Sequence, residues 1–178
     1  MLLKIFFALV VVVAAMSYYI NSQPTEFSLA REVSISAPSA AVFPHVNDFH
    51  LWEQWSPWAK IDPGSKTTFE GPAAGEGAIY HWSGNSKVGE GKMTILKAVA
   101  PNSILISLEF LRPVKSTSIT IFEFKRTDVG TQVIWTMTGT NKFIAKAFQL
   151  VMNMEKMLGP DFEKGLAQLK AVVEGAKK

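Results

Sequence analysis

Residues 103–138, SILISLEFLRPVKSTSITIFEFKRTDVGTQVIWTMT, decide the fold of this chain. They contain three runs rich in β-branched and aromatic residues, Ser103–Leu111, Ser116–Lys125 and Thr131–Thr138, and such runs are typical of strands. Two short breaks separate them, Arg112-Pro113 and Asp128-Val129-Gly130, and both consist of turn-forming residues. Breaks this short leave no room for a crossover helix, so the three strands are predicted to pair consecutively and antiparallel.

Four further strands are predicted before this stretch, so the sheet has about seven strands. They cover Phe27–Ser36, Thr67–Glu70, Ala78–Ser83 and Val88–Val99. Glycine, proline and asparagine follow the last three of them, at Gly71-Pro72, Gly84-Asn85 and Pro101-Asn102. Because these residues favour tight turns, consecutive antiparallel pairing is expected here as well.

Two short helices are predicted between the first and second strands. Ala37-Pro38 begins the first, because proline suits the first helical position. Pro44 must shorten or kink this helix, since proline removes a helical hydrogen bond. Asn47-Asp48 can cap the second helix, which carries Trp52 and Trp55.

Two longer helices are predicted after the sheet. The first, at 142–158, is expected to be interrupted at Gly159-Pro160. The second presents one apolar face formed by Phe162, Leu166, Leu169 and Val173. The complete order predicts an α+β domain at 27–178, in which a curved antiparallel sheet wraps the long C-terminal helix.

Residues 1–20 form a separate apolar segment. The run IFFALVVVVAAMSYYI at 5–20 has no charge, and a spanning helix needs about 20 apolar residues. We expect a single-pass membrane anchor with Lys4 and the N-terminus in the cytoplasm and the domain exported, joined by a polar linker at 21–26. A cleaved signal peptide, which would leave the domain secreted or periplasmic, is one alternative, and a buried helix is the other.

Charge and composition exclude several classes of function. The formal net charge is +3, without the clustered lysine and arginine of a nucleic-acid-binding surface, so no nucleic-acid partner is expected. The chain has no cysteine, which excludes disulfides, thiol catalysis and cysteine-ligated metals. His45, His50 and His81 lack the spacing of a metal site, so neither a metal nor a cofactor is expected.

Five aromatic residues can be read as ligand contacts or as core. Trp52 and Trp55 can share a helical face, either as an aromatic rim at a cavity mouth or as a plug that closes one end of the sheet. Tyr80 and Trp82 share one face of their strand, and Trp135 lies on one face of another. Rings with polar tips suit a pocket for an apolar ligand, and plain core packing is the alternative.

Glu90 is the carboxylate with the best claim to acid–base chemistry. It lies between Gly89 and Gly91 in a predicted strand, and burial in an apolar cavity would let it act as acid, base or ligand anchor. The same tripeptide also fits a bulge or strand edge with a solvated carboxylate. Phe148 and Met152, on the methionine-rich helix at 142–158, could form a gate over a cavity or pack in the core.

A set of motifs then narrows the fold. They are Val33-Ser34-Ile35 with Ala37-Pro38, Asn47-Asp48-Phe49 with Trp52 and Trp55, Ser56-Pro57-Trp58, Gly75 to Tyr80 with Trp82, Gly89-Glu90-Gly91, Gly130-Thr131 with Trp135, and Phe162-Glu163 with Gly165-Leu166 and Leu169. With these motifs the chain resembles the SRPBCC superfamily, in particular its polyketide cyclase/dehydrase-like branch, over residues 27–175. The order of elements is similar to the helix-grip fold of START-type lipid-transfer domains and the pollen-allergen family.

The resemblance implies a hydrophobic cavity between the sheet and the C-terminal helix, because the superfamily includes aromatase/cyclases, lipid carriers and chaperone activators. We therefore predict a membrane-anchored binding domain for a hydrophobic small molecule or lipid. Its expected ligand contacts are Trp52, Trp55, Tyr80, Trp82, Glu90, Trp135, Phe148 and Met152. A cyclase- or dehydratase-like enzyme using Glu90, Tyr80 or His81 is the first alternative, and a protein-interaction or stress-related module of the envelope is the second.

Overall fold

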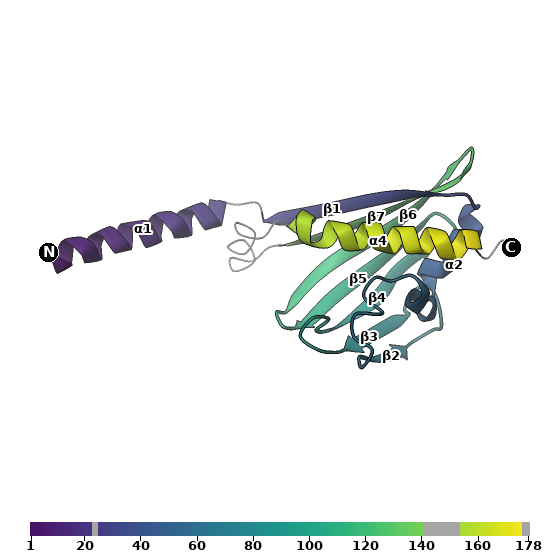
Figure 1. Ribbon diagram of the computed structural model, residues 1–178, viewed down its shortest axis with the longest axis horizontal. Coiled ribbons are helices and arrows are strands. Elements are labelled where there is room, and N and C mark those ends of the chain that lie inside the picture. The colour runs from purple at the N-terminus through teal and green to yellow at the C-terminus, as the bar shows by residue number, and fades with distance from the viewer. Residues whose placement is uncertain (23–24, 141–153, 176–178) are drawn as a thin grey trace.

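The computed structural model describes residues 1–22, 25–140 and 154–175. Its body is a seven-stranded antiparallel sheet with the strand order β1-β7-β6-β5-β4-β3-β2 (Figure 1). The strands are β1 (Glu26–Ile35), β2 (Lys66–Glu70), β3 (Ile79–Ser83), β4 (Glu90–Val99), β5 (Ser103–Arg112), β6 (Ser116–Thr127) and β7 (Gly130–Thr140). The described helices are α1 (Leu2–Ser22), α2 (Ser39–Asn47), the 3₁₀ helix η1 (Phe49–Gln54) and α4 (Met154–Gly175).

All seven predicted strands are present, and the α+β helix-grip arrangement is confirmed. Strands β2 to β7 pair with their neighbours in chain order, as the short turns require. The first strand pairs instead with the last, with Glu26 opposite Thr140 and Ile35 opposite Thr131. Helices α2 and η1 therefore carry the chain from one edge of the sheet to the other.

Both short helices form where they were predicted. Helix α2 ends at Asn47, soon after Pro44, which agrees with the expected shortening. The Asp48 carboxylate then accepts a hydrogen bond of 2.9 Å from the backbone N–H of His50 and so caps η1. The chain turns sharply between α2 and η1 for this reason.

Helix α4 contradicts the predicted interruption, because it continues through Gly159-Pro160 to Gly175. A proline inside a helix removes one hydrogen bond, but tertiary contacts hold both sides of it here. Arg31 of β1 donates from Nε to Glu163 at 2.8 Å and from Nη2 to Glu155 at 3.3 Å. Gly159 leaves room for this guanidinium, since a Cβ at that position would lie 2.7 Å from Nη2.

The predicted apolar face of α4 is buried, and its residues are Phe162, Leu166, Leu169 and Val173. The contact with the sheet centres on Trp135 of β7, whose ring stacks on Phe162 at 4.0 Å and on Phe122 of β6 at 4.8 Å between centroids. Offset stacking of this kind adds to the hydrophobic gain of burying three large rings. The three rings therefore fill the space between α4 and the sheet.

Helix α1 projects away from the sheet at the end where β1 begins (Figure 1). Residues 3–22 have a mean hydropathy of 2.2, and none of this segment is buried against the domain. A helix of 21 residues is about 30 Å long, the thickness of a bilayer core. Helix α1 ends at Ser22 and β1 begins at Glu26, within the stretch expected to be the linker.

We expect Phe162→Ala to lower the free energy of unfolding by about 3–5 kcal/mol, because it removes one ring of the stack and leaves a cavity. Urea unfolding of the full chain in detergent, followed by tryptophan fluorescence, measures this loss. Lys164→Ala, at an exposed position of the same helix, is the control and should change stability by less than about 0.5 kcal/mol. Equal losses for the two variants would contradict the central role of the stack.

Candidate functional site

The face of the sheet that carries α4, here called the inner face, has two differently covered regions. Helix α4 packs along β1, at one edge of the sheet, and leaves β3, β4 and β5 to one side (Figure 1). On β7 and β6 the inner face is buried around the aromatic stack, where Phe122, Phe124, Val133, Trp135 and Met137 lie. On β2 to β5, near the end that carries α1, the inner face keeps partly exposed aromatic side chains, and we call this area the open region.

Trp52 and Trp55 belong to the buried part of the molecule. The indole N–H of Trp52 donates to the Val46 carbonyl at 3.0 Å, and that of Trp55 donates to the His45 carbonyl at 2.9 Å. Both polar atoms are therefore satisfied by α2, so the rings tie η1 to that helix. With Trp135, whose indole N–H donates to the Thr120 hydroxyl at 3.3 Å, they fill the core of the domain.

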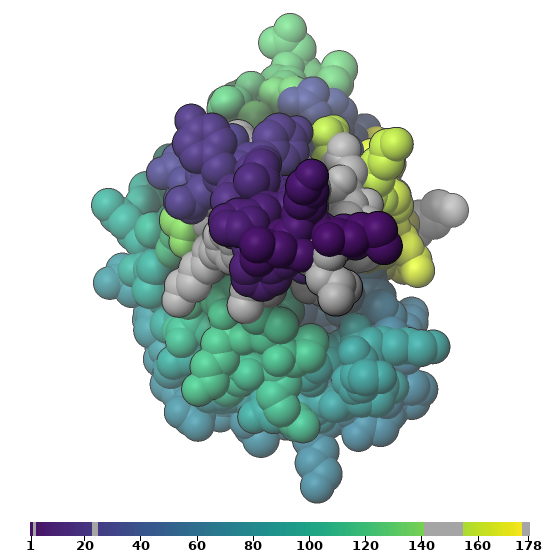
Figure 2. All heavy atoms as spheres, turned by 90° about the vertical axis from the view of Figure 1, so that its left-hand side faces the viewer, coloured from purple at the N-terminus to yellow at the C-terminus, as the bar shows by residue number. Residues whose placement is uncertain are grey.

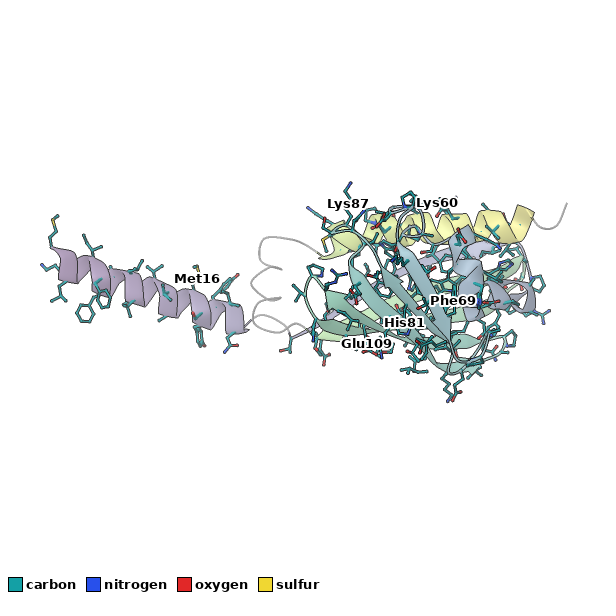
Figure 3. The ribbon with its side chains drawn as sticks, turned by 90° about the horizontal axis from the view of Figure 1, so that it is seen from below. Met16, Lys60, Phe69, His81, Lys87 and Glu109 are labelled. Carbon is teal, nitrogen blue, oxygen red and sulfur yellow. The ribbon has the colours of Figure 1, made fainter. Side chains whose placement is uncertain are left out.

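Tyr80 and Trp82 lie in the open region, and both are partly exposed. Their rings stack at 6.1 Å with an interplanar angle of 23°. Phe69 of β2 continues this arrangement on the Tyr80 side at 5.5 Å, and Phe110 of β5 on the Trp82 side at 5.6 Å. We call these four residues the aromatic row, which crosses the sheet from β2 to β5; Figure 3 labels Phe69 at its beginning.

Gly91 makes the position of Trp82 possible. Gly91 is on β4, opposite Trp82 of β3 and opposite Phe110 of β5. A Cβ at this position would lie 2.5 Å from two carbons of the indole, so only glycine lets the ring lie across the strand. The indole N–H donates to the Val88 carbonyl at 3.0 Å, which fixes the orientation of the ring.

Tyr80 supplies the polar group of the open region. Its ring contacts the buried Phe49 ring at 6.0 Å. Burial raises the pKa of Tyr80, and the negative charge of Glu53 raises it further. The hydroxyl therefore stays protonated at neutral pH and remains able to donate a hydrogen bond.

Glu90 lies on the opposite, outer face of the sheet. Successive residues of a strand alternate between faces, so Glu90 points away from the side to which Gly91 belongs. Its carboxylate pairs with Arg112 at 2.6 Å, and Arg112 also donates to the Ser83 hydroxyl at 3.3 Å. Glu90 is thus separated by the sheet from Tyr80, Trp82 and Trp135.

Further ion pairs continue on the outer face. His81 on β3 lies 3.4 Å from Glu70, and Lys92 lies 3.3 Å from Glu109 (Figure 3). Within the described residues no group of three or more potential ligands could hold a metal ion. The charged side chains of this half of the sheet therefore lie on the side away from the aromatic row.

Sequence reasoning missed four residues of the open region and could not place two others. Phe69, Met93, Leu108 and Phe110 were not predicted, although Phe69 is opposite Tyr80, Phe110 is opposite Gly91 and Leu108 is opposite Met93. Period-two alternation together with hairpin pairing was the signal that could have found them. Phe148 and Met152 lie outside the described residues.

A shallow hollow of about 490 Å³ lies on β1, β7 and β6 near the same end of the sheet. It is lined by residues 26–28, 138–140 and 117–119, which are mostly small and polar. None of the predicted ligand contacts that belong to the described residues lines it. The aromatic row is therefore the feature of the described residues that fits an apolar ligand best.

Residues 26–174 match the protein family described as polyketide cyclase/dehydrase and lipid transport. A protein of unknown function from Staphylococcus aureus superposes with a TM-score of 0.65 at 13% identity, over 85% of this chain and 96% of its own. The Aha1 dimer from Colwellia psychrerythraea gives a TM-score of 0.60 at 12% identity, over 83% and 96%.

A protein from Chromobacterium violaceum gives a TM-score of 0.59 at 18% identity, over 85% of this chain and 99% of its own. At these identities the likeness to solved structures shows the fold alone. No protein with a curated description matches the chain.

We expect Gly91→Ala to displace the Trp82 indole and to cost about 1–3 kcal/mol of stability, because the added methyl group overpacks the contact. The indole N–H signals in a proton–nitrogen NMR spectrum report this displacement, since the bond to Val88 would break. Gly175→Ala, where the added carbon meets nothing within 4 Å, is the control. Unchanged indole signals in Gly91→Ala would refute the contact.

Titration of Tyr80 gives a pH-dependent prediction. Because the pKa of Tyr80 is raised in the folded chain, the unfolded chain loses this proton first as the pH rises. The stability that Tyr80 contributes is therefore complete below about pH 10 and is lost above it. When the native chain is titrated with base, tyrosinate absorbance should include one tyrosine that ionises at a higher pH than the others, and Tyr80→Phe should remove that step. If Tyr80→Phe instead removes a tyrosine that ionises at the ordinary pH, the prediction is contradicted.

Proposed function

The chain belongs to the polyketide cyclase/dehydrase and lipid transport family, and on that premise we propose that its domain binds a hydrophobic small molecule or lipid on the aromatic row. The observation that carries this proposal is the incomplete burial of four aromatic side chains that contact one another on the inner face of the sheet. A ligand lying on them would remove this apolar surface from water, at roughly 25 cal/mol for each Å² covered.

The chemistry of the inner face supports an apolar ligand. In the register of the sheet, the inner positions of β3 to β5 are occupied by apolar or aromatic residues and glycine. They are Tyr80, Trp82, Gly91, Met93, Ile95, Ala98, Ile104, Ile106, Leu108 and Phe110. Tyr80 alone among them carries a hydroxyl, so the ligand would present one polar group to Tyr80 and an apolar body to the other rings.

The positions of the three candidate catalytic residues favour binding over catalysis. Acid–base catalysis needs a titratable side chain within hydrogen-bonding reach of the reacting group. Glu90 is paired with Arg112 on the outer face, and His81 lies on that face beside Glu70. Tyr80 is on the aromatic row, but its raised pKa keeps its hydroxyl protonated at neutral pH, so it does not act as a base there. A carrier or receptor for an apolar molecule therefore fits the described residues better than a cyclase.

We also propose that α1 is an uncleaved membrane anchor that holds the domain at a bilayer. Its length and hydropathy support a membrane span. Lys4 is the one charged side chain of the segment, and a positive N-terminal flank favours a cytoplasmic N-terminus with the domain on the other side. The anchor would then keep the binding domain beside a source of apolar molecules.

Binding of a fluorescent fatty acid to the full chain in nanodiscs of matched lipid, measured by anisotropy, tests the role of the aromatic row. We expect Phe110→Ala to weaken binding about tenfold, because a lost aromatic contact is worth about 1.4 kcal/mol. Trp82→Phe should weaken it less, since most of the ring contact remains.

The matched control is Leu96→Ala, which removes a side chain that is 43% exposed on the bulge of β4, away from the aromatic row. It should bind the probe as the unmodified chain does. Unchanged binding in Phe110→Ala, with Trp82→Phe also unaffected, would show that the ligand does not lie on the aromatic row.

A further inference from the structure

The connection between α1 and the sheet limits how far the domain can lie from the anchor. Helix α1 ends at Ser22 and β1 begins at Glu26. Four peptide units span at most about 14 Å whatever their conformation. The end of the sheet where β1 begins must therefore stay close to the place where α1 ends.

The turn between β5 and β6 lies at this same end. The antiparallel register puts Glu26 opposite Thr140 and Gly139 opposite Ser118. Two residues before Ser118, Ser116 is opposite Phe110. Strands lie about 4.8 Å apart, so the turn is roughly 10–14 Å from the start of β1, measured across the sheet. Figure 2, which looks onto the end that carries α1, shows the teal-green surface of this part of the chain facing the viewer.

This turn, residues 111–115, is exposed along its whole length, and we call it the anchor-side turn. Leu111 is 38% and Val114 64% exposed, and the exposed Lys115 follows Val114, whereas Arg112 is paired with Glu90. Lys87, in the neighbouring turn between β3 and β4, adds another exposed cation. Exposed apolar side chains beside cations are typical of segments that lie in the headgroup layer of a membrane.

We propose that the anchor-side turn docks onto the surface of the bilayer that holds α1, with Val114 among the headgroups and Lys115 beside anionic lipid. This inference rests on the proposed membrane anchor. The short connection supplies the geometric argument, because it holds this end of the sheet and not the other beside the bilayer. The exposed cations supply the argument from charge, because they attract anionic headgroups.

Docking in this way would connect the aromatic row with the membrane. Phe110, the last residue of the row, immediately precedes Leu111 of the anchor-side turn. Trp82 lies beside Phe110, on the strand that ends at the turn containing Lys87. The row therefore leads to the docked end, and an apolar molecule could pass between the bilayer and the row along it.

The opposite end of the sheet offers a matched control. The turn between β6 and β7 carries Val129, which is 76% exposed and thus even more accessible than Val114. This turn joins Thr127 of β6 to Gly130 of β7. It lies at the end of the two strands that is away from α1. Its neighbour Asp128 is negatively charged, so it should avoid an anionic surface.

The absence of cysteine makes a single-site experiment possible. Val114→Cys and Val129→Cys, each in the full chain, are labelled with an environment-sensitive fluorophore and reconstituted into phosphatidylcholine vesicles that contain phosphatidylglycerol. Spin-labelled lipid then quenches any fluorophore at the headgroup layer. We expect several-fold stronger quenching, and a blue-shifted emission, at position 114 compared with position 129.

Added Lys87→Glu and Lys115→Glu substitutions should reduce the quenching at position 114, because they remove the attraction to phosphatidylglycerol. Washing the vesicles at alkaline pH separates the two proposals. Retention of the chain with equal quenching at both positions would overturn docking and leave the anchor intact. Release of the chain from the vesicles would overturn the proposed anchor and, with it, the docking of the anchor-side turn. It would not affect the proposed ligand site, because binding of the fatty acid to the aromatic row is measured in a separate experiment.

Discussion

The stacking of Trp135 between Phe122 and Phe162 is the contact on which the rest of the domain depends. It joins β6 and β7 to α4 and fills the space between them with rigid rings. Because α4 is fixed over β1 and β7 at one edge of the sheet, it cannot cover the inner face of the strands toward the other edge, β2 to β5. The exposed aromatic row is thus a direct consequence of where the core is filled.

Local patterns in the sequence predicted the strands, the turns and the Asp48 cap, because each depends on neighbouring residues. They failed at Pro160, since the helix is held there by Arg31, whose partners are more than a hundred residues away. Trp52 and Trp55 show the same limit for the site. Their spacing was equally compatible with a rim and a plug, and only the carbonyl groups of α2 that accept their N–H groups place them in the core.

Glu90 and Trp82 show why the candidate site could be predicted only in part. Alternation along a strand says that Glu90 and Gly91 point to opposite faces, but it does not say which face carries the helix. That choice depends on how the whole sheet packs. Once Gly91 is opposite Trp82, the indole occupies the place of the missing side chain and Glu90 is left to pair with Arg112 on the other side.

The short connection between Ser22 and Glu26 determines how weak a contact between the domain and a bilayer can be and still form. With α1 as the membrane anchor that we propose, a connection this short keeps the domain at an effective concentration of about a millimolar or more at the bilayer surface. A surface turn whose own dissociation constant is only millimolar would then be docked for half of the time. Such weak contacts form and break quickly. The domain could therefore rock on and off the membrane many times without ever leaving it.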